Sequence, residues 1–153
     1  HLVSHFGGHA AAAGLTLNKA HFEEFRQIFT QYIAEMDQEL FQATLWTDGI
    51  LPDTAVSLST LDQIEQLGPW GQKFPLPQFE GSFKVIDYRW LKDQHLKLKL
   101  ALGQQVVDAI AFNAADRFEF NPMLGYVDLV YTLERNVFNG ITSLQLQVVY
   151  LSQ

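Results

Sequence analysis

Residues 95–102 have the sequence HLKLKLAL, and this stretch decides the fold predicted for the second half of the chain. Leucines and lysines alternate along it, in the order Leu96, Lys97, Leu98, Lys99, Leu100, with Leu102 following after one alanine. Successive side chains of a β-strand point to opposite faces of the sheet. The alternation therefore predicts a strand with one buried face and one basic face.

Four further runs around this stretch have the same period of two. They are FKVIDYRWL (83–91), VVDAIAFN (106–113), YVDLVYTLE (126–134) and SLQLQVVYL (143–151). The longest connection lies between the third and fourth of the five runs. Five strands with one longer connection fit a small Greek-key barrel of the oligonucleotide/oligosaccharide-binding (OB) kind. Strand counting alone equally permits an SH3-like barrel or half of a β-sandwich.

The first half of the chain is predicted to be mixed. Apolar residues recur at three- and four-residue spacing from Phe22 to Leu40, which predicts an amphipathic helix with Asn18 as its N-cap. Residues 43–51 predict a short strand and a turn, and a second helix is expected from about Ser59, its cap, to Leu67. The predicted fold class is α+β.

A segment rich in proline and glycine, GPWGQKFPLPQF (68–79), follows the second predicted helix. Proline lacks an N–H donor and glycine weakens regular structure, so the segment predicts a linker. The expected organisation is a first domain over 1–67, a linker over 68–79 and the barrel over 80–153.

The composition narrows the class of protein. Hydrophobic residues make up 48% of the 153 residues and charged residues 18%, which predicts a folded chain. The absence of cysteine excludes disulfides and thiolate metal sites, and no run approaches the roughly 20 apolar residues of a membrane span. We expect a cytoplasmic protein without membrane contact. The chain starts without methionine inside an apolar run, which suggests part of something longer.

Positive charge is concentrated locally, although the net charge of -7 argues against a protein that coats nucleic acid. The predicted strands bring together a set of cations and aromatic rings: Lys84, Tyr88, Arg89, Trp90, Lys92, Lys97 and Lys99. Cations that meet phosphates and rings that meet unstacked bases are what a single-strand nucleic-acid surface needs. The alternative is a solvated strand face whose lysines prevent edge pairing and whose aromatic residues belong to the core.

The stretch GGHAAAAG (7–14) is the second candidate site. A glycine turn at Gly7 and Gly8, followed by alanines that start a helix, would point successive N–H groups at an anion, with His9 as an added donor. The alternative is a tight turn with a surface histidine. His1, His5 and His9 are spaced by four residues, but the glycine pair between the last two argues against a shared metal site. No G-x-S-x-G element occurs, so the residues alone assemble no complete active site.

Taken together, several motifs resemble the C-terminal part of the bacterial RecJ family of the DHH phosphoesterase superfamily. They are HFGGHAAAAGLTL, LGPWGQKFPLPQF, HLKLKLAL, DAIAFN and NVFNGITSLQLQVV, and they extend over nearly the whole chain. The resemblance implies the end of a DHH-associated domain followed by an OB-fold domain. It further implies a single-stranded-DNA-specific 5′→3′ exonuclease of recombination and repair.

The resemblance also implies roles for particular residues. Gly7, Gly8, His9 and Gly14 would contact the DNA strand or its scissile phosphate, and the barrel would hold the incoming strand. The Mn²⁺ or Mg²⁺ ions of the complete enzyme would be bound by an N-terminal DHH domain, because this chain has no Asp-His-His signature. No metal site and no nuclease activity are expected in the chain by itself. A competing interpretation is a non-catalytic barrel that docks single-stranded-DNA-binding protein.

Overall fold

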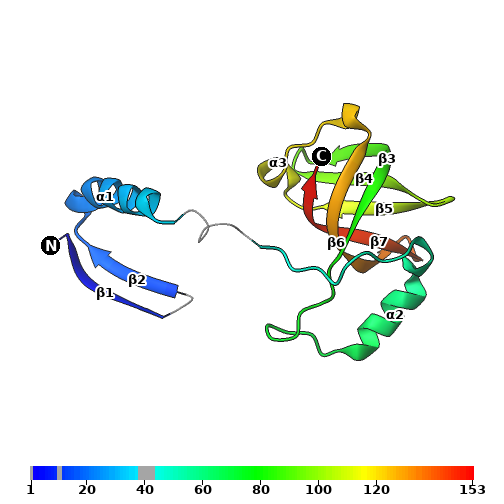
Figure 1. Ribbon diagram of the computed structural model, residues 1–153, viewed down its shortest axis with the longest axis horizontal. Helices are drawn as coiled ribbons and strands as arrows, with labels where there is room; N and C mark the ends of the chain where they lie inside the picture. The colour runs from blue at the N-terminus through cyan, green and yellow to red at the C-terminus, as the bar shows by residue number, and fades with distance from the viewer. Residues whose placement is uncertain (1, 10–11, 38–43) are drawn as a thin grey trace. The chain divides into compact units, whose positions relative to one another are not determined.

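The computed structural model describes residues 2–9, 12–37 and 44–153, and it divides the chain into two compact units, His1–Leu45 and Trp46–Gln153 (Figure 1). No helix among these described residues is long and apolar enough to cross a membrane. The predicted boundary at residues 68–79 lies inside the second unit. The helix that precedes it therefore belongs with the barrel and not with the first unit.

The first unit begins with a β-hairpin in place of the predicted glycine turn and helix start. Strand β1 (Val3–His9) pairs antiparallel with β2 (Ala12–Leu17), so that Gly7 faces Gly14 and His9 faces Ala12. The prediction of a helix starting in the alanines is wrong. Alanine is a good helix former, but intrinsic helix propensity is a weak preference, and pairing with the preceding strand overrides it.

The amphipathic helix predicted after the hairpin is confirmed and is shorter than expected. Asn18 caps a short 3-10 turn (Lys19–His21), where its side chain accepts a hydrogen bond from the backbone N–H of Ala20 at 3.0 Å. Helix α1 (Phe22–Glu35) follows directly. Leu40, the last residue of the predicted pattern, lies outside the described residues.

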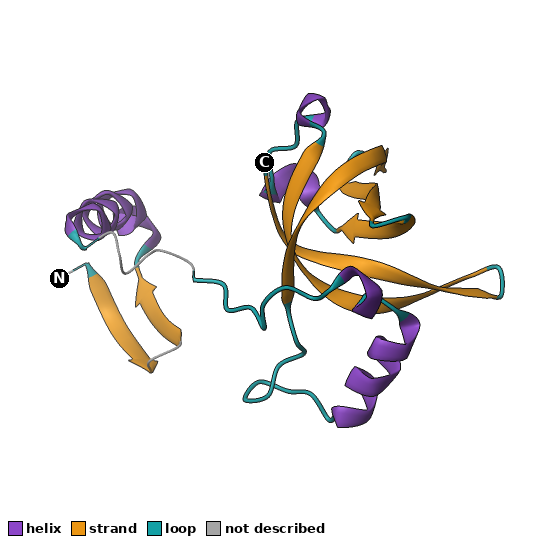
Figure 2. Ribbon diagram, turned by 45° about the vertical axis from the view of Figure 1, so that its right-hand side comes forward, coloured by secondary structure: helices purple, strands orange, loops and turns teal. Residues whose placement is uncertain are grey.

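The second unit is built around a closed five-stranded barrel, as the period-two runs predict (Figures 1 and 2). Its strands are β3 (Phe79–Leu91), β4 (His95–Leu102), β5 (Gln105–Ala111), β6 (Tyr126–Phe138) and β7 (Ile141–Ser152). The order around the barrel is β3-β4-β5-β7-β6, with β6 closing onto β3 and only the β5–β7 pair parallel. This is the OB arrangement, and the short helix α3 (Ala114–Arg117) lies in the long connection before β6.

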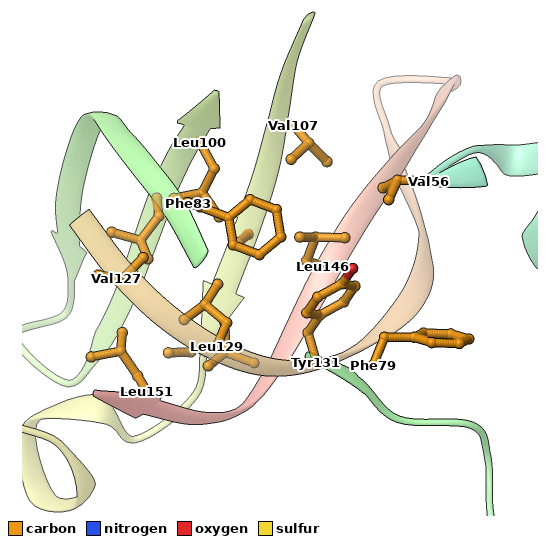
Figure 3. Close-up of a cluster of buried hydrophobic side chains, with 14 of the residues drawn as sticks. Val56, Phe79, Phe83, Leu100, Val107, Val127, Leu129, Tyr131, Leu146 and Leu151 are labelled. Atoms are coloured by element: carbon orange, nitrogen blue, oxygen red, sulfur yellow. The ribbon is translucent and has the colours of Figure 1, made fainter. Parts of the chain in front are cut away.

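The barrel interior is filled by the alternating apolar positions (Figure 3). Leu96, Leu98 and Leu100 of the opening stretch are fully buried. They meet rings from other strands, including Phe83 and Tyr131, whose centroids lie 5.6 Å apart in an edge-to-face arrangement. Such pairs add to the free energy that burial of their area provides.

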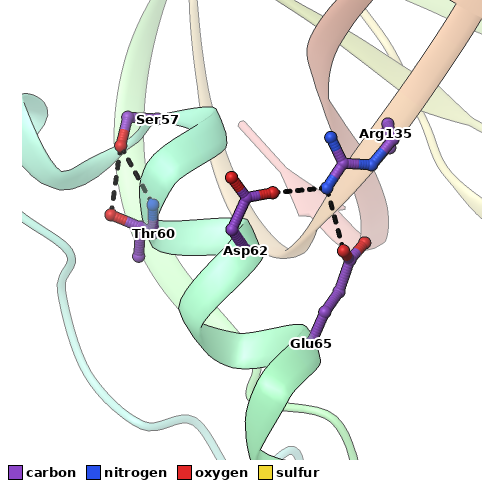
Figure 4. A network of polar contacts seen from close by, with 5 residues as sticks. All are labelled: Ser57, Thr60, Asp62, Glu65 and Arg135. Atoms are coloured by element: carbon purple, nitrogen blue, oxygen red, sulfur yellow. Dashed lines mark hydrogen bonds and ion pairs between the residues drawn. The ribbon is translucent and has the colours of Figure 1, made fainter.

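Helix α2 (Leu58–Leu67) covers part of the barrel (Figure 1). Its cap is Ser57, two residues before the predicted Ser59, because the Ser57 hydroxyl accepts from the Thr60 N–H at 3.2 Å. Arg135 of β6 donates to carboxylates of this helix at 2.6 Å and 2.8 Å (Figure 4), and these carboxylates belong to Asp62 and Glu65. The hydrogen bonds and the negative charge raise the pKa of Arg135.

Residues 44–50 form no strand of their own, which corrects the prediction for 43–51; Ala43 itself lies outside the described residues. The segment attaches to the beginning of the barrel instead. The Asp48 N–H donates to the Gln78 carbonyl at 2.7 Å and the Glu80 N–H donates to the Gly49 carbonyl at 3.1 Å. Trp70 of the predicted linker packs against the buried core of the second unit, and within the linker its ring stacks on Phe74 with centroids 4.6 Å apart.

Candidate nucleic-acid interface

The lysines of β4 lie on the outer face of the barrel, as the alternation predicts. Pairing with β3 brings Arg89 opposite Lys97 and Asp87 opposite Lys99, and pairing with β5 brings Asp108 opposite Lys99. Opposed residues of an antiparallel pair point to the same face. Three cations and two carboxylates therefore share one outer surface across β3, β4 and β5.

This surface is hollowed. Two adjoining depressions, of about 350 Å³ and 460 Å³, share the side chains of Arg89, Lys97, Asp108 and Phe138 as part of their lining. Because they share these residues, we treat them as one feature and call it the groove. Its charged side is formed by β3 and β4, and the β6–β7 hairpin forms the opposite wall.

One ion pair reduces the positive charge of the groove. Lys97 Nζ lies 2.8 Å from Asp108 Oδ2, and both side chains are more than half buried. The carboxylate neutralises much of the charge of Lys97. Arg89 and Lys99 have no ion-pair partner among the residues that the structure describes, so they are the cations available to an anionic ligand.

A β-bulge in β3 changes which of its residues share a face. The register shifts between Val85 and Asp87. Before the shift, Lys84 faces exposed Tyr126, whereas after it Tyr88 and Trp90 face the buried Leu98 and Leu96. A strict period of two along residues 83–91 predicts that Lys84, Tyr88 and Trp90 share one face of the strand. This prediction is wrong, because the extra residue in the bulge reverses the alternation.

The two aromatic residues of this set turn toward the inner side of the barrel end. Tyr88 packs edge-to-face against Phe120 with ring centroids 5.2 Å apart, and Trp90 is 36% exposed. Their position supports the alternative that aromatic residues of β3 contribute to packing. Trp90 does not line the groove, whereas Tyr88 is 41% exposed and lines one of the two depressions beside Arg89, Lys97 and Lys99.

Lys92 lies in the turn from β3 to β4. It and Asp93 have positive φ values of 52° and 53°, and the Gln94 N–H donates to the Leu91 carbonyl at 3.1 Å. Residues 92–94 connect the two strands, and Leu91 faces His95 across this three-residue turn. Lys92 is exposed there and is not part of the groove lining.

The wall formed by the β6–β7 hairpin is a functional candidate that the sequence interpretation missed. The period-two runs end at residue 134 and resume at residue 143, which predicts a turn over 135–142, but β6 continues to Phe138 and β7 begins at Ile141. Only Asn139 and Gly140 form the turn, with φ values of 49° and 76°. Asn-Gly between apolar residues is a strong signal for a two-residue hairpin, and it could have revealed this wall.

The first candidate element, residues 7–14, is spread over the β1–β2 hairpin. A Cβ atom at Gly8 would lie 3.0 Å from the Cβ of Ala13, so close strand approach explains that glycine. At Gly7 and Gly14, which face each other, a Cβ would meet nothing within 4 Å among the described residues. His9 is exposed. No group of three or more metal-ligating side chains occurs in the described part of the chain, and His1 lies outside it.

Comparison with known proteins gives one consistent family. Residues 47–150 match the model of the RecJ OB domain. Over 98% of its length the chain is 41% identical to the single-stranded-DNA-specific exonuclease RecJ of Haemophilus influenzae, of which it covers 27%. The Escherichia coli K12 protein of the same name is 36% identical over 92% of the chain and 25% of the relative. The chain thus spans about a quarter of the length of these relatives.

Among solved structures, the fold also matches that of a RecJ protein. The crystal structure of Thermus thermophilus RecJ in complex with Mg²⁺ superimposes with a TM-score of 0.73 at 22% identity, over 99% of this chain and 23% of that one. A structure of the same protein in complex with Mn²⁺ gives the same TM-score at 24% identity. The closed barrel with its β3-β4-β5-β7-β6 order, the family model over the barrel and the sequence identity agree. The chain belongs to the RecJ family, and residues 47–150 are its OB domain.

Proposed function

We propose that this chain is the C-terminal, DNA-binding part of a single-stranded-DNA-specific 5′→3′ exonuclease that acts in recombination and repair. In this proposal the groove holds the incoming strand and positions it for hydrolysis in the complete enzyme. The activity proposed for the complete protein is supported by the relatives, which carry the name single-stranded-DNA-specific exonuclease RecJ. Mn²⁺ or Mg²⁺ ions would activate water and neutralise phosphoryl oxygens there.

The observation that carries the proposal is the arrangement of cations in the groove. Arg89 and Lys99 lie on the same outer surface of β3 and β4, without ion-pair partners among the described residues. Lysine and arginine bind phosphates, and the usual nucleic-acid surface of this fold includes its second strand, here β4, which carries Lys99 and pairs with Arg89 of β3. Lys97 contributes less because Asp108 already neutralises it.

The β1–β2 hairpin has a separate role in the proposal. Gly7 and Gly14 face each other across the hairpin and leave open space where side chains would stand. Bare backbone of this kind allows a ligand to approach closely. We assign Gly7, Gly8, His9 and Gly14 to contact with the DNA strand near its scissile phosphate. A His9→Ala substitution in the complete enzyme should reduce turnover, and normal exonuclease rates would contradict the assignment.

Strand binding is tested with the chain itself by fluorescence anisotropy of a labelled dT15 oligonucleotide at several salt concentrations. The Lys99→Glu and Arg89→Glu variants should bind more weakly, and each lost phosphate contact should reduce the slope of log K against log salt by about 0.7. Lys73→Glu makes the same change of charge in the exposed segment before the barrel and should bind like the parent chain. Unchanged affinity of both groove variants would contradict the proposal.

Catalysis is tested separately. The described residues contain no cluster of metal-ligating side chains, so the chain alone should release no nucleotides from a 5′-labelled oligonucleotide in Mn²⁺. Release that persists after removal of contaminating nucleases would show that the catalytic metals are bound here. In the complete enzyme, the proposal assigns those metals to a DHH domain.

Binding of a protein partner is the competing function of Arg89 and Lys99. Single-stranded-DNA-binding protein is the candidate, since an acidic peptide segment would meet Arg89 and Lys99 as phosphates do. Titration of the chain with an acidic peptide, and competition of that peptide against dT15, distinguishes the two uses. Binding of the peptide without binding of the oligonucleotide would favour the docking role.

A further inference from the structure

We propose that Phe138 stacks on a base of single-stranded DNA in the groove, so that the bases follow the β6–β7 wall and the phosphates follow β3 and β4. This inference rests on the proposed function and assigns an orientation to the bound strand. It also identifies a residue that sets the contribution of the bases to affinity.

Phe138 is exposed at a place that the hairpin fixes. It is the last residue of β6 and lies opposite Ile141, the first residue of β7. The side chains are 69% and 71% exposed, and both line the groove. The tight turn at Asn139 and Gly140 joins the two strands directly, so the ring is carried by paired strands and not by a loose loop.

Packing against another ring does not explain the position of Phe138. Other rings of the barrel pair with each other, as Phe83 does with Tyr131. Phe138 has no ring partner among the residues that the structure describes. An exposed aromatic ring that lines a hollow is a typical binding residue.

The charged and apolar side chains that line the groove indicate which kind of ligand it binds. On the β6–β7 side, the exposed apolar side chains of Phe138 and Ile141 accompany the polar Asn136, Ser143 and Gln145, and the cations of the groove come from Arg89 and Lys99 on the β3–β4 side. A ligand that satisfies both sides has anionic groups along one edge and flat apolar faces along the other. Single-stranded nucleic acid has this chemistry, because its bases are not covered by a complementary strand.

Of the two rings first considered for this role, Trp90 does not line the groove, and Tyr88, which lines one depression, already has a ring partner in Phe120. Tyr88 and Trp90 lie on the inner side of β3 after the bulge, and Tyr88 packs on Phe120 at 5.2 Å. Phe138 reaches the same charged surface from the opposite side of the groove. Stacking is therefore assigned to the hairpin and not to β3.

The test separates bases from phosphates by comparing dT15 with an abasic oligonucleotide of equal length. Phe138→Ala should weaken binding of dT15 by roughly fivefold to a hundredfold, the fold-change that corresponds to loss of one stacked base. Binding of the abasic strand should not change. Phe138→Trp should restore the affinity for dT15, since any aromatic ring offers a stacking face.

The matched control is Val137→Ala. Val137 is the preceding residue of β6 and is 63% exposed, but its side chain leaves the other face of the hairpin. This variant should bind both oligonucleotides like the parent chain. If Val137→Ala and Phe138→Ala weaken binding equally, the effect comes from the hairpin as a whole and the inference is overturned.

The remaining outcomes are also decisive. If the parent chain binds dT15 and Phe138→Ala binds it equally well, the stacking role is refuted while the proposed function stands. If the parent chain binds neither oligonucleotide, the proposed function itself fails. If Phe138→Ala weakens binding of an acidic peptide and leaves dT15 unaffected, the wall serves a protein partner and the inference is wrong.

Discussion

The buried hydroxyl of Tyr131 should make the barrel sensitive to alkaline pH. Tyr131 is 1% exposed, and burial, together with the negative charge of Asp53, raises its pKa from 10.0 to about 12. Below the lower value the phenol is protonated in both the folded and the unfolded chain. As the pH rises from 10 toward 12, the unfolded chain releases the proton while the folded barrel retains it. The free energy of unfolding therefore falls over this range.

The magnitude follows from the difference between the two pKa values. One pKa unit corresponds to 1.36 kcal/mol, so Tyr131 should account for a loss of about 2 kcal/mol between pH 9 and pH 12, somewhat less than two full units because the folded barrel itself begins to release the proton near pH 12. Tyr131→Phe retains the ring and removes the ionisable group. Its free energy of unfolding should decline less over this range than that of the parent chain, by about this amount.

Urea unfolding followed by tryptophan fluorescence measures this difference. The three tryptophans of the chain, Trp46, Trp70 and Trp90, all lie in the second unit, so the signal reports on the barrel and its attached helix. Tyr126→Phe serves as the control, because it removes an exposed phenol. Parallel pH profiles for the parent chain and Tyr131→Phe would refute the reasoning. Asp53→Asn should reduce the effect without abolishing it, since burial is the larger cause.

Three further changes test other parts of the structure. Leu98→Ala, at a fully buried position, should lower the free energy of unfolding by about 2–5 kcal/mol, measured by urea denaturation. Arg135→Met removes the hydrogen bonds to α2, so amide hydrogens of that helix should exchange faster while those of β4 keep their protection. Asp108→Asn frees Lys97 for phosphate and should raise the affinity for dT15 and steepen its salt dependence, whereas an unchanged salt slope would show that Lys97 does not reach the strand.

Much of the barrel could be predicted from local pattern because each strand has one face in the core. The leucines of β4 are fully buried and its lysines face outward, as the alternation in residues 95–102 requires. Helix α1 was recognised for the same reason, since its apolar residues repeat with the helical period. Both patterns are local, and neither depends on which other element packs against them.

The β1–β2 hairpin could not be predicted from a local pattern. Residues 12 and 13 are alanines, and their composition favoured a helix, yet they pair as β2 with the strand before them. Backbone hydrogen bonds between β1 and β2 decide this outcome. Pairing between segments is a property of two stretches at once, so the composition of either one does not reveal it.

The sequence by itself determined the five strands of the second unit and the outward direction of Lys97 and Lys99, because a period of two assigns side chains to faces within each strand. The same pattern left an SH3-like barrel or half of a β-sandwich open. Only the tertiary structure decided how those faces combine. The bulge between Val85 and Asp87 turned the rings of β3 inward, and strand pairing placed Asp108 against Lys97. The turn at residues 139 and 140 brought Phe138 to the opposite wall of the groove. A register shift, an ion pair between strands and a shared wall all depend on distances between segments, which no local pattern contains.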